Sequence, residues 1–350
     1  CFNPKNRMSL NNMNYTQRVA ALASLGDSLK SAINDEALIH RASIHNQWFT
    51  PEFQKQAFSS WSDSLKIENL QSWLEVYDIQ NKKIEQKTVA IIMAGNIPLV
   101  GLHDLISVLA CGHAALIKPS SDDTVLMEWI VKELKRIEPG FENLIKISEE
   151  RQMKDFDAVI ATGSNNSFRY FEYYFKDKPA LLRKNRNSIA VLSGNESTQS
   201  LELLSDDVFQ YFGLGCRNVS KVLVPKDFFV DPMFEAFEKY KEHINHNKYA
   251  NNYTYHKAIF LMNLTPHLDN NFLLFKQDEK IASPLGVLLF DYYESIEQVK
   301  DYINLHKDEI QCIVSEMPLE NAVAFGQSQY PALNDYADGV DTIQFLMNLS

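Results

Sequence analysis

Residues 88–98 have the sequence TVAIIMAGNIP, and this stretch decides the fold. Thr88–Met93 is an unbroken run of β-branched and other apolar residues, which is typical of a strand buried on both faces. A Gly-Asn-x-Pro turn follows, and an apolar helix is predicted from about Leu99 to Cys111. A buried strand followed directly by a helix is the repeating unit of a parallel α/β sheet.

The same alternation continues along the chain. Further strands are predicted at Ala114–Lys118, Ala158–Thr162 and Ile189–Leu192. Helices are predicted at Asp122–Ile137, with an acidic first turn, and at Phe168–Phe175. Alternating short strands and helices indicate a parallel sheet covered on both faces, and such sheets bind ligands at the carboxyl ends of their strands.

The segment before this sheet is helical in pattern. Apolar residues recur at three- and four-residue spacing from Val19 to Leu29, as an amphipathic helix requires. Thr50 is the predicted N-cap of another helix, with Pro51 at its first position. We interpret this segment as a packing layer. Met8 or Met13 is a plausible native start, so Cys1–Arg7 is left out of the fold.

A second alternating region begins near Asp206. Its predicted strands are Lys221–Val224, Ala258–Met262, Gly286–Phe290 and Gln311–Ser315, and its predicted helices are Pro232–His243 and Ser295–His306. No flexible linker separates the two regions. The sequence therefore predicts a first domain over 8–204, a second over 205–333, and a C-terminal tail over 334–350.

Composition excludes several classes of protein. Acidic residues outnumber basic ones by 45 to 34, for a net charge of −11, which argues against nucleic acid or an anionic membrane as the main partner. The longest apolar run has seven residues, too short for a predicted membrane span. The four cysteines lie far apart without CxxC spacing, so we predict no metal site and expect a reducing cytoplasm.

Cys216 is the predicted nucleophile. It follows Gly213-Leu214-Gly215, and two glycines within three residues leave the sulfur approachable. Arg217 beside it, and a helix expected to begin just after it, would both favour the thiolate. Cys111 and Cys312 lie in apolar runs and are interpreted as buried small hydrophobic residues.

Other candidates lie where predicted strands end. Asn96 fits a turn for backbone reasons, but its amide is also a good donor to an oxyanion. Lys118 and Ser120 could reach the ribose or phosphate of a nucleotide. Gly163 and Ser164 would offer N–H groups and a hydroxyl to a pyrophosphate. Each motif is weak alone, and their order and spacing together are far more specific.

In these motifs the chain resembles the aldehyde dehydrogenase superfamily, and within it the fatty acyl-CoA reductases related to the reductase subunit of bacterial luminescence. Gly95–Pro98 matches the oxyanion turn, Ile117–Ser120 the Lys-Pro-Ser strand end, and Ala161–Ser164 the pyrophosphate segment. Gly213–Lys221 matches the nucleophile segment, and Ser283–Gly286 matches the turn near the nicotinamide ribose.

The resemblance implies an aldehyde-dehydrogenase-like α/β fold, with a Rossmann-type parallel sheet domain and a second α/β catalytic domain. It implies Cys216 and Asn96 as catalytic residues. The cofactor-binding residues that it implies are Ala94, Gly95, Lys118, Ser120, Ser121, Thr162, Gly163, Ser164 and Ser283.

Two departures from the superfamily pattern are informative. Hydrolytic members carry a Glu general base where this chain has Arg183–Ser188, which contains no carboxylate, so a thioester at Cys216 should survive until a thiol or hydride attacks it. Ser121 stands where NAD-preferring members often have Glu, which leaves NADPH acceptable beside NADH. Ser283 also replaces a usual ribose-binding Glu.

The expected activity is reduction of an acyl thioester, fatty in the related reductases, to an aldehyde with NADPH, through a cysteine acyl-enzyme. The acyl donor would be an acyl-CoA or an acyl-carrier thioester. The alternatives are an acyl-phosphate reductase and a non-catalytic nucleotide- or acyl-binding relative. A basic cluster between Lys176 and Arg186 could receive phosphates or be a solvated loop. A homo-oligomer remains open.

Overall fold

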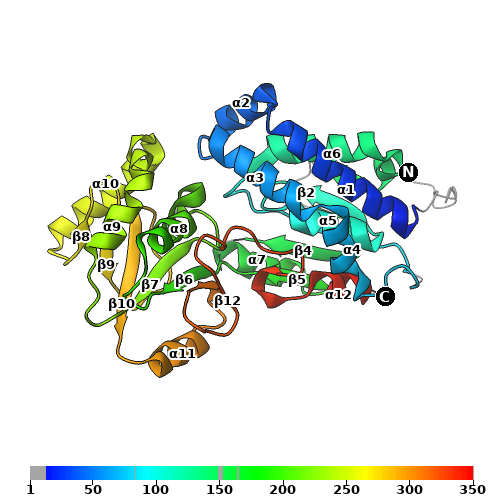
Figure 1. Ribbon diagram of the computed structural model, residues 1–350. Helices are drawn as coiled ribbons and strands as arrows, with labels where there is room; N and C mark the ends of the chain where they lie inside the picture. Colours follow the sequence, from blue (N-terminus) through cyan, green and yellow to red (C-terminus); the bar gives the residue numbers. More distant parts are fainter. Residues whose placement is uncertain (1–12, 83, 149–152, 164, 350) are drawn as a thin grey trace. The chain divides into compact units, whose positions relative to one another are not determined.

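The computed structural model describes residues 13–82, 84–148, 153–163 and 165–349 (Figure 1). Cys1–Arg7 and Met8 lie outside these residues. The chain divides into two compact units. The first runs to Lys184 and includes the segment from Ala332 onward, and the second is Asn185–Pro331.

The first unit contains a five-stranded parallel sheet with the order β3-β2-β1-β4-β5. Its strands are β1 (Thr88–Ile92), β2 (Ala114–Lys118), β3 (Ile145–Ile147), β4 (Ala158–Thr162) and β5 (Ala180–Arg183). The three strands predicted here from apolar runs are confirmed to within a residue. β3 and β5 have only three and four residues, which is too short for a run of apolar residues to reveal them.

Helices cover both faces of this sheet. The helices of the first unit are α1 (Tyr15–Ala32), α2 (Glu36–His45), α3 (Pro51–Ser64), α4 (Ile67–Glu75), α5 (Leu102–Cys111), α6 (Thr124–Ile137), α7 (Asn165–Tyr174) and α12 (Thr342–Met347), with short 3-10 turns η1 (Ser121–Asp123), η2 (Pro139–Asn143) and η5 (Ala337–Gly339). Figure 1 shows α1, α3 and α6 packed together over one side of the sheet. The Thr50 hydroxyl accepts a hydrogen bond from the Phe53 N–H at 3.3 Å, which confirms the predicted N-cap.

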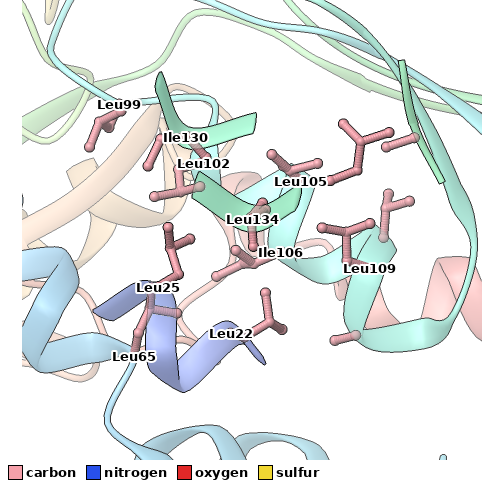
Figure 2. Packing of buried hydrophobic residues seen from close by; sticks show 14 of the residues in the cluster. Leu22, Leu25, Leu65, Leu99, Leu102, Leu105, Ile106, Leu109, Ile130 and Leu134 are labelled. Atoms are coloured by element: carbon pink, nitrogen blue, oxygen red, sulfur yellow. The ribbon is translucent and has the colours of Figure 1, made fainter. Parts of the chain in front are cut away.

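β1 has apolar contacts on both faces. Val89 and Ile91 join the core that the N-terminal helices share with α5 and α6, part of which Figure 2 shows. Ala90 and Ile92 point to the opposite face, where they meet Phe171 at α7 and neighbouring residues. Because side chains alternate along a strand, an unbroken apolar run is what burial on both faces requires.

The second unit contains a seven-stranded sheet with the order β12-β11-β6-β7-β10-β9-β8, in which only the β8–β9 pair is antiparallel. Its elements are β6 (Asn187–Val191), α8 (Thr198–Phe209), η3 (Gln210–Gly213), β7 (Val219–Pro225), α9 (Asp231–Phe237), η4 (Glu238–Asn245), α10 (Asn247–Met262), β8 (Leu268–Asp269), β9 (Leu274–Gln277), β10 (Val287–Tyr293), α11 (Ile296–Leu305), β11 (Ile310–Val314) and β12 (Ala322–Val323).

The strand predicted at Ala258–Met262 is wrong, because these residues form the last turns of α10. A short apolar run does not by itself distinguish a strand from a buried helix. Tyr249, Tyr253 and Phe260 recur at helical spacing and supply the buried side of α10.

The unit boundary also differs from the predicted one after Leu204. β6 pairs with β7, and Leu201 and Leu204 of α8 lie in the core of the second unit. The C-terminal segment is part of the first unit, since Ile343 and Leu346 are buried in its core. Among the described residues, no helix is long and apolar enough to cross a bilayer.

Candidate active site

The carboxyl edge of the first sheet gathers most of the predicted cofactor residues. β1 lies between β2 and β4, and Ile92 is paired with Lys118 on one side and Ala161 on the other. The Met93 N–H also donates to the Lys118 carbonyl at 3.1 Å. Ala94–Asn96, Lys118–Ser121 and Thr162–Gly163 therefore follow three neighbouring parallel strands at one edge. This strand order places a topological switch point between β1 and β4, which is where such sheets bind dinucleotides.

Gly95 lets the turn after β1 approach the turn after β2. A Cβ atom at Gly95 would lie 2.5 Å from the Ser120 Cβ and 2.6 Å from its Oγ, so no other residue fits without a shift of the chain. The Ser120 hydroxyl accepts from the Asp122 N–H at 3.3 Å and begins η1. Ser121 is exposed, and its carbonyl contacts the His45 Nε2 at 2.6 Å. The contact from His45 was not predicted.

The side chain of Asn96 is exposed in the turn after β1, while Pro98 and Leu99 are buried. Leu99 has a φ of +59°, which is uncommon for a residue other than glycine. Its N–H donates to Oδ2 of Asp123 at 2.8 Å. The sequence had indicated Asp123 only as part of an acidic first turn, but its carboxyl group makes no capping bond to α6 and contacts the Asn96 turn instead.

Thr162 ends β4 and is partly buried, as is Gly163. A Cβ atom at Gly163 would lie 2.9 Å from both the Ser167 Cβ and the Phe171 ring, so the glycine allows close packing of the strand end against α7. Ser164 lies outside the described residues.

Cys216 lies in a tightly constrained loop of the second unit. Tyr211, Phe212 and Gly213 have φ values of +52°, +58° and +76°, three consecutive residues in the left-handed region. Non-glycine residues in this region cost about 1–3 kcal/mol each and cluster at functional sites. The Gly215 N–H donates to the Asn218 Oδ1 at 2.8 Å, and the Asn218 N–H donates to the Gly215 carbonyl at 3.1 Å.

Hydrogen bonds hold this loop at the amino edge of the second sheet. Ser188, at the start of β6, donates its hydroxyl to the Cys216 carbonyl at 3.0 Å. Arg217 Nε donates to the Ser328 carbonyl at 2.7 Å. The predicted helix after Cys216 is wrong, because β7 begins at Val219. Of the two features expected to favour the thiolate, Arg217 is present beside Cys216 and the following helix is not.

Of the cysteines that the structure describes, Cys216 is the one that is partly exposed. Cys111 is 1% exposed, and burial raises the pKa of its thiol to about 12, which suits an inert core residue. Cys312 is also buried, at 6% exposed. These burials agree with the interpretation of the two residues from their apolar neighbours.

Asp207 and Asn218 are site-building residues that sequence reasoning missed. The Asn218 amide donates to the carbonyls of Asp207 and Gln210 at 3.1 and 2.9 Å. The Asp207 carboxylate accepts N–H bonds from Gly326 and Ser328 at 2.6 and 2.9 Å, and burial raises its pKa to about 6. Asp207 lies three residues after Leu204 on the buried side of α8, and this spacing is a signal that could have found it.

The Ser283–Gly286 turn precedes β10 as Cys216 precedes β7, and these two strands are parallel neighbours. Gly286 has a φ of +78° and packs against Tyr253. The Ser220 hydroxyl donates to the Ile281 carbonyl at 2.8 Å, so β7 also holds the chain that leads into the turn. Ser283 and Cys216 are therefore both placed at the amino edge of this sheet. Asn96 belongs to the other unit.

The basic cluster is largely committed to other contacts. Arg183 is buried in an ion pair with Asp104. Lys178 donates to the Phe156 carbonyl at 2.5 Å, and Lys184 lies over the Phe168 ring. Arg186 donates to the Ile310 carbonyl at 3.3 Å.

A sequence profile of the acyl-CoA reductase (LuxC) family matches residues 66–314, which is more than half of the chain. The chain belongs to the acyl-CoA reductase (LuxC) family. The matched range includes every candidate site residue from Ala94 to Ser283. Membership in this reductase family places the chain among oxidoreductases of acyl and aldehyde groups. No curated protein sequence matches it.

Solved structures of aldehyde dehydrogenases share the fold of this acyl-CoA reductase family member. Aldehyde dehydrogenase 21 from Physcomitrella patens, solved with succinate, has a TM-score of 0.72 at 13% identity and covers 97% of this chain and 85% of its own. The aldehyde dehydrogenase KauB from Pseudomonas aeruginosa has a TM-score of 0.67 at 14% identity, with coverages of 88% and 73%. An NAD+ complex of a Bacillus cereus aldehyde dehydrogenase has a TM-score of 0.65 at 13% identity, and the match covers 90% of this chain and 74% of that one. The predicted aldehyde-dehydrogenase-like fold is confirmed.

Proposed function

We propose that this protein is an NADPH-dependent acyl-CoA reductase that converts a fatty acyl thioester to an aldehyde through an acyl-enzyme at Cys216. The Cys216 loop carries this proposal. It combines a partly exposed cysteine, three residues with left-handed φ values before it and a turn around it that two hydrogen bonds between Gly215 and Asn218 close. Such an arrangement suits a nucleophile that must meet an electrophile, and a structural cysteine does not need it.

The residues at the carboxyl edge of the first sheet fit a nicotinamide dinucleotide. Gly95 lets the turn after β1 pack closely on the turn after β2, and Gly163 lets the end of β4 pack closely on α7. At the same edge Lys118 offers positive charge and Ser120 offers a hydroxyl. Ser121 is exposed and uncharged, so it would not repel a 2′-phosphate, which supports NADPH beside NADH. A reduced nicotinamide cofactor, when bound, supplies the hydride that releases the acyl group as an aldehyde and returns the Cys216 thiolate.

The chain's own residues perform the first half-reaction. The Cys216 thiolate attacks the carbonyl carbon of the acyl thioester and forms a new carbon–sulfur bond. The Asn96 amide and the Cys216 backbone N–H donate to the oxyanion that develops. Collapse of this adduct breaks the bond to CoA, which leaves as a thiolate, and the acyl group stays on Cys216. Ser188 holds the Cys216 carbonyl and so steadies this peptide during the step.

The lack of a carboxylate in Arg183–Ser188 supports transfer over hydrolysis. Arg183 begins this segment and is engaged in an ion pair with Asp104. Glu196, the next acid along the chain, contacts Ser193 and accepts from the Gly194 N–H at 3.1 Å, in the turn that follows β6. β6 runs parallel to β7, so this turn lies at the opposite edge of the sheet from Cys216. Five residues of strand separate the edges by about 16 Å.

The test is intact-mass analysis after mixing the protein with fatty acyl-CoA in the absence of cofactor. One acyl group should add to the wild type and to Cys312→Ala, and none to Cys216→Ala. Added NADPH should then release aldehyde. An adduct that maps to Cys111 or Cys312 contradicts the proposal. Activity with acyl phosphate but not acyl-CoA would favour the acyl-phosphate alternative, and binding without any adduct would favour a non-catalytic relative.

A further inference from the structure

Asp123 is a buried acid whose placement is unusual. Asp123 is only 2% exposed, and its Oδ2 accepts a hydrogen bond from the Leu99 N–H at 2.8 Å. Oδ1 is also buried and has no hydrogen-bond partner among the described residues. Burial raises the pKa of this carboxyl group well above its usual range. Burying an acid that has no ion-pair partner among the described residues is costly, so the contact that its carboxyl group does make calls for an explanation.

Leu99 shows what that role is. Its φ of +59° is unfavourable for a branched apolar residue, and its side chain is fully buried in the core with Leu102 and Ile130 (Figure 2). The left-handed conformation turns the Leu99 N–H toward Asp123 and lets the chain enter α5. The hydrogen bond to Asp123 offsets the backbone strain at Leu99 and gives the buried Leu99 N–H an acceptor.

Asp123 also contacts the turn after β2, which contains the candidate cofactor residue Ser120. The Asp123 N–H donates to the Ser120 carbonyl at 3.1 Å. A Cβ atom on Gly95 would lie 3.2 Å from the Asp123 nitrogen, so the two turns are packed against each other at this point. The Asp123 side chain thus reaches the turn after β1, while its backbone belongs to the turn after β2.

We propose that Asp123 is a positioning residue for acyl transfer: its carboxyl group fixes the Gly95–Leu99 turn and thereby orients the Asn96 amide toward the oxyanion. This inference rests on the proposed function, since it assumes Asn96 as the donor. Asp123 does not touch the substrate in this scheme. It acts through Leu99, and its backbone contact to Ser120 remains when only the side chain is changed.

Three variants separate this role from a general loss of stability. Asp123→Ala removes the acceptor. Asp123→Asn keeps a carbonyl oxygen for the Leu99 N–H and is neutral, as the protonated acid is. Asp122→Asn changes the neighbouring, exposed acid and serves as the control. The readouts are the rate of CoA release in a single turnover without cofactor, and the dissociation constant for NADPH.

Misplacing a catalytic group by about 1 Å costs roughly a hundredfold, so Asp123→Ala should slow CoA release by about 10- to 100-fold. The dissociation constant for NADPH should stay within about threefold, because the backbone bond to Ser120 persists. Asp123→Asn and Asp122→Asn should both release CoA within about threefold of the wild-type rate. A folded Asp123→Ala with a wild-type rate, or an Asp123→Asn as slow as Asp123→Ala, would overturn the proposal.

Hydrogen–deuterium exchange resolved to the Leu99 amide tests the bond without any turnover. The amide should exchange slowly in the wild type and in Asp123→Asn. Rapid exchange in the folded wild type overturns the proposal, even where Asp123→Ala does not fold. If the wild type neither forms an acyl-enzyme nor turns over while the Leu99 amide is protected, the proposed function has failed and the assignment of Asp123 to oxyanion positioning fails with it. If the wild type is acylated normally but the Leu99 amide is unprotected, the role of Asp123 is rejected and the proposed function stands.

Discussion

Arg183 donates its Nη1 to Oδ1 of Asp104 at 2.5 Å, and the two side chains are 6% and 5% exposed. The same guanidinium donates through Nη2 to the Thr342 hydroxyl at 2.8 Å. Arg183 thus connects the end of β5 to α5 and to the C-terminal α12. The superfamily resemblance predicts a general-base Glu in this segment of hydrolytic members, whereas here Arg183 is a buried structural cation.

Replacing Arg183 with Met should destabilise the first unit, because Asp104 would remain buried without its partner. Breaking a buried pair from one side typically costs about 3–5 kcal/mol of unfolding free energy. The double variant Arg183→Met with Asp104→Leu replaces both charges with apolar groups and should recover a large part of this loss. Urea unfolding of the three proteins measures both effects.

The matched control for this pair is Lys226–Glu294, whose side chains are 72% and 66% exposed at a distance of 3.1 Å. Lys226→Met should change the unfolding free energy far less, because water screens an exposed pair. Equal losses for Arg183→Met and Lys226→Met would contradict a special contribution of the buried pair.

Asn96→Ala should reduce turnover about a hundred- to a thousandfold, since this is the usual cost of losing an oxyanion donor. Fold and cofactor affinity should be nearly unchanged, because the Asn96 side chain is exposed. Steady-state rates and circular dichroism provide the check, with the exposed Asn195→Ala as a control. An effect under about threefold is worth less than 1 kcal/mol and would mean that Asn96 serves only the turn.

The acyl-enzyme should persist in buffer for many turnover times and be removed quickly by added CoA. A thioester is intrinsically hydrolysable, so its lifetime depends on a positioned base. Glu196 is held by its own turn at the far edge of the second sheet, so Glu196→Gln should leave the decay rate unchanged. The measurement is decay of the acyl adduct by mass, with and without CoA. Rapid release of free fatty acid without CoA would reveal a working base.

Asp207 should make the stability of the second unit depend on pH. Its pKa is about 6 in the folded protein against an ordinary value of 3.8, so the folded state binds a proton that the unfolded state releases. This stabilisation is full below about pH 3.8 and is lost as the pH rises through 6. The difference in unfolding free energy between the wild type and Asp207→Asn should fall by about 3 kcal/mol across that window.

Denaturant unfolding at closely spaced pH values measures this dependence. Asp227→Asn, which changes an exposed acid of the same unit, should show no comparable slope relative to the wild type. A difference for Asp207→Asn that stays flat or rises with pH would show that Gly326 and Ser328 hold Asp207 ionised in the folded state.

Local pattern was sufficient for three strands of the first sheet and for the order of the motifs. The apolar runs of β1, β2 and β4 were found because burial on both faces demands them, and the turn glycines marked where backbone segments meet. The strand proposed at Ala258–Met262 failed because five apolar residues fit a helix equally well. The boundary at Lys184 was missed because pairing between β6 and β7 is a contact between distant segments.

The sequence by itself determined the fold class and the family, and it supplied the candidate site residues, since these follow from residue type and spacing. Only the tertiary structure decided how those residues are held. Asp123 accepts from Leu99, which lies 24 positions away in the chain, and Ser188 holds the carbonyl of Cys216 from 28 positions away. Neither contact leaves a periodic signal, because a hydrogen bond between distant segments depends on how the chain folds back and not on local sequence.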